Sequence, residues 1–264
     1  MMDTKIDRNV EDIRARHIRR QKQRRQTMLR RRMIFFAVSG LILLSIILFF
    51  TPLFNIRNVN VLGTSRVDAA QIKQVMGSVE GENLFRLNTK RMITNAKTIP
   101  YVDDVVIKKK MFSVAVDVNV SECVPIGCIE NNDKYIVVDK NFKVLEFLDA
   151  PMENAMQITG VSVVAATEGA VITTDDSENL EVMTQVCTEL MNQGIFADIG
   201  TISFQDIYNI SFNYQNRLDV VCGSVVDFSK KIGMFKKAVS SSKLNENSRG
   251  TIDISKSGQA TYKP

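Results

Sequence analysis

The stretch MIFFAVSGLILLSIILFFTPLF, residues 33–54, contains no charged residue and is long enough to cross a membrane as a helix. About 20 apolar residues span a hydrocarbon core of roughly 30 Å, and a helix satisfies its backbone hydrogen bonds internally. A buried core helix of this length would carry a polar face, and a cleaved signal peptide would have a shorter apolar region followed by small residues. We therefore expect one retained transmembrane helix over residues 33–54.

Basic residues gather immediately before this apolar stretch. Residues 1–32 contain 12 Lys or Arg and 4 Asp or Glu, a net charge of +8, so the chain total of +5 leaves −3 for residues 33–264. Basic residues that flank a membrane span stay on the cytoplasmic side. We therefore expect residues 1–32 to form a cytoplasmic tail that contacts anionic lipid headgroups rather than nucleic acid. The arginines expected to set this topology are Arg24, Arg25, Arg30, Arg31 and Arg32.

The outer part of the chain lacks the residues of the common catalytic and metal-binding mechanisms. The only histidine, His17, lies in the tail, which removes Ser-His and Cys-His catalysis and histidine ligation from the outer side. The adjacent carboxylates Asp103-Asp104 and Asp175-Asp176 suit strand and helix-capping roles better than acid-base catalysis. Lys108-Lys109-Lys110 could form an electrostatic patch, but the run is more typical of a solvated hairpin. We therefore expect no enzymatic activity, no cofactor and no metal.

Four cysteines, Cys123, Cys128, Cys187 and Cys222, lie on the expected outer side. None of them forms a CxxC pair, and no histidine is nearby to complete a metal site. Cys123 and Cys128 are too far apart for a disulfide if the chain between them is extended. We expect four free, mostly buried thiols, although an even number in an exported domain also permits disulfides.

The first outer block, residues 55–124, begins and ends with alternating apolar and polar residues, which is the pattern of a half-buried strand. Between these ends, apolar residues at helical spacing predict two helices, and Lys109-Lys110 is expected to form a tight turn between the last two strands. The expected elements are strand 54–61, helix 69–76, helix 87–99, strand 102–109 and strand 114–120. This order is β-α-α-β-β.

The second outer block, residues 125–264, combines short strands with two convincing amphipathic helices. The expected elements are strands 127–130, 134–139, 143–147 and 157–163, helix 177–193, strands 199–204, 208–214 and 217–222, helix 227–240 and strand 251–255, with 260–263 as a further candidate strand. The predicted fold class is therefore α+β, with a mostly antiparallel sheet in this second block, behind a single transmembrane helix.

Short motifs follow one another in a characteristic order along both blocks: IRNVNVLG (56–63), GENLF (81–85), PYV (100–102), VDVNVSE (116–122), YIVVD (135–139), ITG (158–160), LDVVCG (218–223) and TIDI (251–254). Their order and spacing resemble the FtsQ family of bacterial cell-division proteins, called DivIB in Gram-positive bacteria. The resemblance implies a POTRA domain followed by a β domain. Cys123 stands where the family usually has Arg, and Phe142 stands where Gly often follows the Asp at position 139.

The resemblance implies a non-enzymatic scaffold of the divisome in the cell membrane, enriched at the septum. It implies binding of FtsL-like and FtsB/DivIC-like coiled-coil membrane proteins, besides other divisome proteins, and support of septal peptidoglycan synthesis. Partner contacts in the family's C-terminal region would fall on Thr251, Ile252, Asp253, Ile254 and Ser255. We expect this segment to be an open edge strand that accepts a partner strand, beside helix 227–240, with the strand edge at 102–107 as a second docking surface.

Two other functions fit parts of the same sequence. A POTRA-type polypeptide-binding chaperone in membrane protein assembly or secretion would usually carry several POTRA repeats or a barrel, and the sequence shows one such block. A membrane-tethered cell-wall enzyme would need a nucleophile with a base, or two carboxylates in a cleft.

Overall fold

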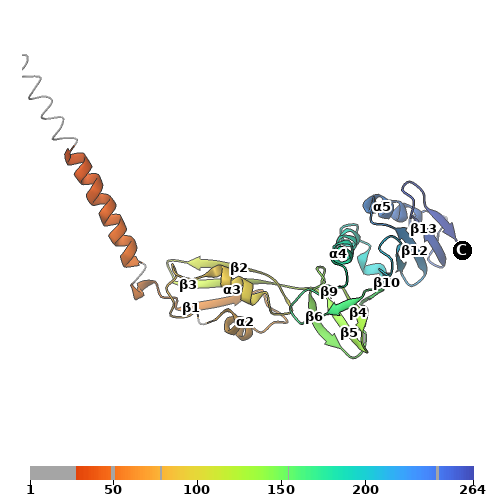
Figure 1. Cartoon of the computed structure of the whole chain (residues 1–264), viewed down its shortest axis with the longest axis horizontal. Coiled ribbons are helices and arrows are strands. Elements are labelled where there is room, and N and C mark those ends of the chain that lie inside the picture. The colour runs from red at the N-terminus through yellow and green to blue at the C-terminus, as the bar shows by residue number, and fades with distance from the viewer. Residues whose placement is uncertain (1–27, 49–50, 78, 154, 242–243) are drawn as a thin grey trace, which may run out of the picture. The chain divides into compact units, whose positions relative to one another are not determined.

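The structure, a computed structural model, describes residues 28–48, 51–77, 79–153, 155–241 and 244–264. Within these residues, one helix, Met28–Leu48, is long and apolar enough to cross a membrane (Figure 1). The expected outer end of the span instead forms a separate 3₁₀ turn, Pro52–Phe54, because proline lacks the amide hydrogen that would continue the helix. Arg30, Arg31 and Arg32 lie on the described helix, whereas Arg24 and Arg25 fall outside the described residues.

The chain divides into two compact units. The first unit contains the residues up to Asn58 together with Glu80–Leu87 and Lys110–Ala115. The second unit contains the rest of the first outer block and all of the second block. The loops at one end of the first block therefore belong with the segment that follows the apolar helix.

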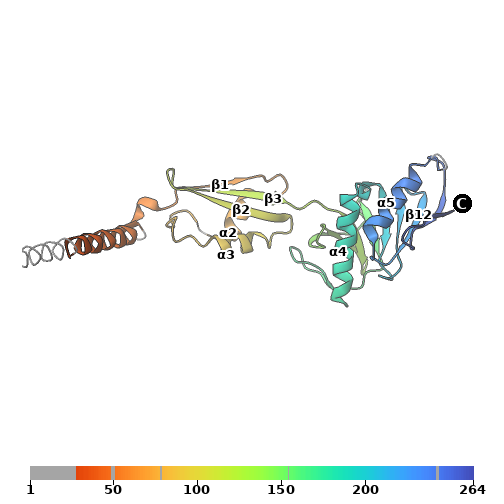
Figure 2. The ribbon, with the colours of Figure 1, turned by 90° about the horizontal axis from the view of Figure 1, so that it is seen from above.

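The first outer block has the predicted order β-α-α-β-β. Its elements are β1 (Asn58–Leu62), α2 (Ala69–Met76), α3 (Thr89–Ala96), β2 (Val102–Lys110) and β3 (Ala115–Glu122). The strands form a sheet in the order β1-β3-β2, with both helices on one face (Figure 2). Apolar side chains of α2, α3 and β3, including Ile72, Met92 and Val118, are buried.

The predicted turn at Lys109-Lys110 is wrong. β2 continues through Lys110, and the chain turns over residues 111–114 instead. Val114 closes the turn with a φ of 48°, a left-handed conformation that is rare for a β-branched residue. Alternation alone did not reveal the true position of the turn. Val114 fits the apolar alternation of β3, but its backbone is not in the extended conformation of a strand.

The second outer block is built on a nine-stranded sheet in the order β14-β13-β12-β11-β10-β7-β4-β5-β6. Its strands are β4 (Gly127–Asn131), β5 (Lys134–Val138), β6 (Val144–Leu148), β7 (Met156–Thr159), β10 (Ile199–Ser203), β11 (Ile210–Tyr214), β12 (Leu218–Gly223), β13 (Gly250–Asp253) and β14 (Thr261–Lys263). The pairs β4–β7, β7–β10 and β12–β13 are parallel, and the other pairs are antiparallel. A separate hairpin joins β8 (Val163–Ala165) to β9 (Thr173–Thr174).

Two helices, α4 (Ser177–Asn192) and α5 (Phe228–Val239), lie side by side against this sheet (Figure 2). Asp176 caps α4 by accepting the N–H of Glu178 at 2.9 Å, so the predicted capping role of Asp175-Asp176 is confirmed at Asp176. The ring of Phe235 on α5 packs edge-to-face against Phe212 of β11, with centroids 5.6 Å apart. Each parallel strand pair needs a crossover connection, and α4 and α5 lie in the connections to β10 and β13.

Candidate partner-binding edge and domain junction

The segment 251–255, expected to be an open edge, instead contributes its residues 251–253 to β13, an interior strand of the sheet. Ile252 is in register with Val220 of β12 on one side and with Tyr262 of β14 on the other. The side chains of Ile252 and Ile254 are fully buried. The expectation of an exposed edge at Thr251–Ser255 is therefore wrong, because the chain returns over residues 261–263 and covers β13.

The exposed edge at this end of the sheet is β14. Its three residues are all exposed, and β14 ends the strand order within the described residues. The hydroxyl of Tyr262 donates to the carbonyl of Arg249 at 2.6 Å, which ties β14 to the start of β13. Gly250 has a φ of 135°, and a Cβ there would collide with the carbonyl oxygen of Lys263. Glycine at this position thus lets β14 pair closely with β13.

The second expected edge, β2, is an edge strand in the three-stranded sheet. Its adjacent carboxylates have different partners: Asp103 pairs with Lys140 at 3.1 Å, and Asp104 pairs with Lys97 at 2.8 Å. The hydrogen bond from Lys97 holds the pKa of Asp104 below its ordinary value. These separate ion pairs support the predicted structural role of Asp103-Asp104.

The β6 end of the large sheet contacts the first outer block through Lys143. The Lys143 Nζ donates to the carbonyl oxygens of Lys97 at 2.9 Å, Ile99 at 2.8 Å and Val102 at 2.7 Å. An ammonium group has three donors, so all are used on the chain that leaves α3. A positive charge near the C-terminal end of a helix also interacts favourably with the helix dipole. Lys143 therefore joins the two outer blocks through main-chain contacts.

A tyrosine reinforces the same junction. The Tyr101 hydroxyl donates to Oε1 of Glu146 on β6 at 2.7 Å, and the guanidinium of Arg66 lies 5.3 Å from the centre of the Tyr101 ring. Burial, together with the hydrogen bond to Glu146, raises the pKa of Tyr101 to about 12. The phenol therefore stays protonated and donating at neutral pH.

The turn between β5 and β6 presents Asp139 to the same junction. Asp139 is buried, and its Oδ1 accepts the backbone N–H groups of Asn141 at 2.9 Å and Lys143 at 2.8 Å. Phe142, inside this turn, has a φ of 58° and a fully buried side chain. The turn thus keeps the left-handed conformation that glycine often supplies in the resembled family, but it adds an aromatic ring to the core.

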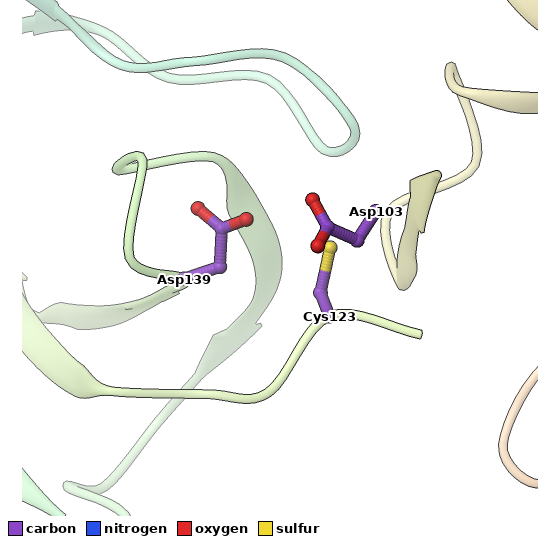
Figure 3. A group of neighbouring side chains, drawn as sticks. All are labelled: Asp103, Cys123 and Asp139. Atoms are coloured by element: carbon purple, nitrogen blue, oxygen red, sulfur yellow. The ribbon is translucent and has the colours of Figure 1, made fainter. Parts of the chain in front are cut away.

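Asp103, Cys123 and Asp139 gather from three segments with their ligand atoms all within 4.8 Å of one another (Figure 3). Burial and the neighbouring Asp139 carboxylate raise the pKa of the Cys123 thiol to about 12. A thiol must lose its proton to ligate a metal, and the Lys140 ammonium already supplies a positive charge to Asp103. The chemistry of the group fits a hydrogen-bonded junction better than a metal centre.

The four cysteines, Cys123, Cys128, Cys187 and Cys222, are free and buried, as predicted. Burial raises the pKa of each thiol, to about 12 for Cys187. A protonated, buried thiol is a poor nucleophile. These side chains therefore act as small apolar residues of the core.

Glu122, the last residue of the motif VDVNVSE, binds the loop before α2. Its Oε1 accepts the backbone N–H groups of Ser65, Arg66 and Val67 at 2.7–2.9 Å, just before α2. Burial would raise the pKa of Glu122, but these three amides hold it below its ordinary value. The carboxylate thus fixes the loop that carries Arg66 to the Tyr101 ring.

No local pattern in the sequence marks the junction, although three of the family-like motifs meet there. PYV contributes Tyr101, YIVVD contributes Asp139, and VDVNVSE ends beside Cys123. Nothing in the sequence indicated the role of Lys143, because a lysine that follows a turn is common on protein surfaces. The available signal was the clustering of family-like motifs around residues 100, 122 and 139.

The first outer block matches a known domain family, and similar proteins extend over both blocks. Residues 54–122 match the family model of the POTRA domain, FtsQ-type. The cell division protein DivIB of Clostridium acetobutylicum is 26% identical over 212 residues, which cover 80% of this chain and 83% of that protein. DivIB of Clostridium tetani is 23% identical over 225 residues, covering 84% of both proteins. The cell division protein FtsQ of Corynebacterium glutamicum is 29% identical over 118 residues, covering 45% of this chain and 52% of that protein.

Proposed function

We propose that this chain, which belongs to the FtsQ/DivIB family of cell-division proteins, is a non-enzymatic scaffold that collects other membrane proteins of the divisome. The names of its relatives support a role in the divisome. The partners that we propose are FtsL-like and FtsB/DivIC-like coiled-coil proteins, through which the chain would support septal peptidoglycan synthesis. The proposed setting is the septal cell membrane, with the N-terminus cytoplasmic and residues 55–264 outside.

The observation that carries this proposal is the C-terminal end of the nine-stranded sheet. β14 is exposed and is paired on one side alone within the described residues. An exposed edge accepts a partner strand through main-chain hydrogen bonds, with alternate side chains giving specificity. We assign the partner strand to the outer edge of β14, and Thr251–Ser255 to the segment whose strand β13 pairs with the other edge of β14. β2 of the POTRA domain is the proposed second docking edge.

The test of this assignment removes the outward-facing donor of β14. The N–H groups of Gly250 and Ile254 donate to β12, so the N–H groups of the alternate residues of β13 between them face β14. These residues are the partners of Thr261 and Lys263, which leaves the N–H of Tyr262 facing the open edge. Tyr262→Pro deletes this N–H from an edge strand, where proline is tolerated. We expect the full-length variant to lose co-purification with the FtsL-like and FtsB/DivIC-like proteins while it stays folded.

Tyr262→Ala is the matched control, since it also loses the hydrogen bond from the Tyr262 hydroxyl to Arg249 but keeps the backbone N–H. Wild-type recovery of the partners by the folded Tyr262→Pro variant would contradict the assigned edge. Recovery of unfolded membrane proteins in place of the division proteins would instead favour a POTRA-type chaperone.

A further inference from the structure

The turn between β2 and β3 presents two large apolar side chains to solvent. Phe112 has a relative exposure of 105%, and Met111 is 55% exposed. Lys108, Lys109 and Lys110 immediately precede them on β2. A single exposed apolar residue is ordinary on a protein surface. An aromatic and a methionine together at the tip of a basic hairpin form a distinct amphipathic feature, which partner binding at β14 does not use.

This tip lies close along the chain to the end of the apolar helix. The N–H of Arg57 donates to the carbonyl oxygen of Val114 at 3.0 Å, so β1 begins beside the tip. Leu48 and Arg57 are nine positions apart, and a fully extended chain of that length covers about 30 Å. The tip is therefore held within a short reach of the point where the helix ends.

The GENLF loop, residues 81–85, holds the segment between the helix and β1 by hydrogen bonds. The N–H of Ile56 donates to the carbonyl of Glu82, and the N–H of Leu84 donates to the carbonyl of Phe54, each at 2.9 Å. Asn83 Nδ2 donates to the carbonyl of Thr51 at 3.2 Å. The segment leaving the helix is thus fastened to the same compact unit that contains Lys110–Ala115.

We propose that the β2–β3 turn is a membrane-surface contact, in which Met111 and Phe112 enter the boundary between headgroups and acyl chains of the bilayer that the helix spans. Apolar side chains such as Phe and Leu enter this boundary in elements that lie on a membrane surface, and lysines near a membrane are attracted to anionic headgroups. The occupant is a lipid surface because the turn is continuous with the membrane-anchoring unit and carries the charge that complements anionic lipid. The turn gives the POTRA domain a second attachment to the bilayer besides the helix.

The chain contains no tryptophan, so a single introduced indole reports its surroundings without background. The experiment places full-length Phe112→Trp in lipid vesicles that contain anionic lipid, with and without phospholipids brominated on the acyl chains. Phe112 is fully exposed, so the substitution removes no packing. We expect the brominated lipids to quench most of the tryptophan fluorescence of this variant.

Two matched variants set the scale of this measurement. Leu53→Trp, in the 3₁₀ turn Pro52–Phe54, is the positive control, and Tyr208→Trp replaces an aromatic in the β domain that is 72% exposed. Quenching of the Phe112→Trp variant close to that of the Leu53→Trp variant supports the proposal. Quenching no greater than that of the Tyr208→Trp variant overturns it, as does an indole at position 112 that becomes shielded only when a division partner is added.

Discussion

The two edges of the nine-stranded sheet differ in whether another segment of the chain covers their backbone. At the β6 end, the carbonyl and N–H of Val144 bond to Gly169 and Ala170 at 2.9 and 2.8 Å, so a loop closes part of the edge. At the β14 end, three exposed residues finish the sheet, and no described segment pairs with their outer side. Unpaired edges invite pairing with another chain and are normally protected. The β6 end is thus partly covered by its own chain, whereas the outer side of β14 is left unpaired within the described residues.

The largest expected change in stability comes from the turn that leads into β6. Phe142→Ala removes a fully buried ring and should lower the free energy of unfolding by about 3–5 kcal/mol. Phe142→Gly should be less destabilising than Ala by roughly 0.5–1 kcal/mol, because glycine adopts positive φ without strain. Urea unfolding of the chain in detergent, followed by circular dichroism, measures both values.

Phe112→Ala is the control for this prediction, since it truncates a phenylalanine that is fully exposed. Its unfolding free energy should stay within about 0.5 kcal/mol of wild type. Equal losses at Phe112 and Phe142 would contradict the assignment of Phe142 to the core.

A smaller effect is expected where the β6 end meets the POTRA domain. Lys143→Met keeps an unbranched side chain but leaves three carbonyl oxygens without their donor, which should cost about 1–3 kcal/mol. Lys140→Met removes a single exposed ion pair with Asp103 and should cost less than about 1 kcal/mol. Thermal unfolding compares them, and similar losses in both variants would show that Lys143 does not hold the junction.

The smallest effect depends on pH and tests Tyr101. Tyr101→Phe should cost about 0.5–1.5 kcal/mol at pH 8, since the lost hydrogen bond to Glu146 is partly screened by solvent. The pKa of Tyr101 is raised from 10.0 to about 12 in the folded chain. The stabilisation is therefore complete below pH 10 and is lost as the pH rises toward 12. Unfolding free energies measured from pH 8 to 12 should converge for wild type and variant, and a constant difference would contradict the assignment.

The fold class and most elements were predictable from local pattern. Apolar and polar alternation located β3, and helical spacing located α2, α4 and α5 to within a few residues of their observed ends. The motif order also led to the family. The turn at residues 111–114 was missed because backbone conformation at Val114 departs from its apolar period.

The candidate site was less predictable, because an edge strand is defined by the absence of a neighbour. Thr251–Ser255 has the pattern of a strand, but whether residues 261–263 cover it depends on the path of the loop between them. The contacts of Lys143 and Glu146 likewise join residues more than 40 positions apart, and no local pattern encodes such pairs.

The sequence by itself determined the apolar helix, the uneven charge before and after it, the absence of histidine from residues 55–264 and the alternation of the elements there. Each of these follows from composition or from a period along the chain, because it depends only on residue types and on the spacing of near neighbours. Only the tertiary structure decided that β14 rather than β13 forms the edge, that Lys143 and Tyr101 join the two outer blocks, and that Phe112 stands exposed beside the chain leaving the helix. These features depend on which distant segments fold next to each other, and that is set by the packing of the whole domain.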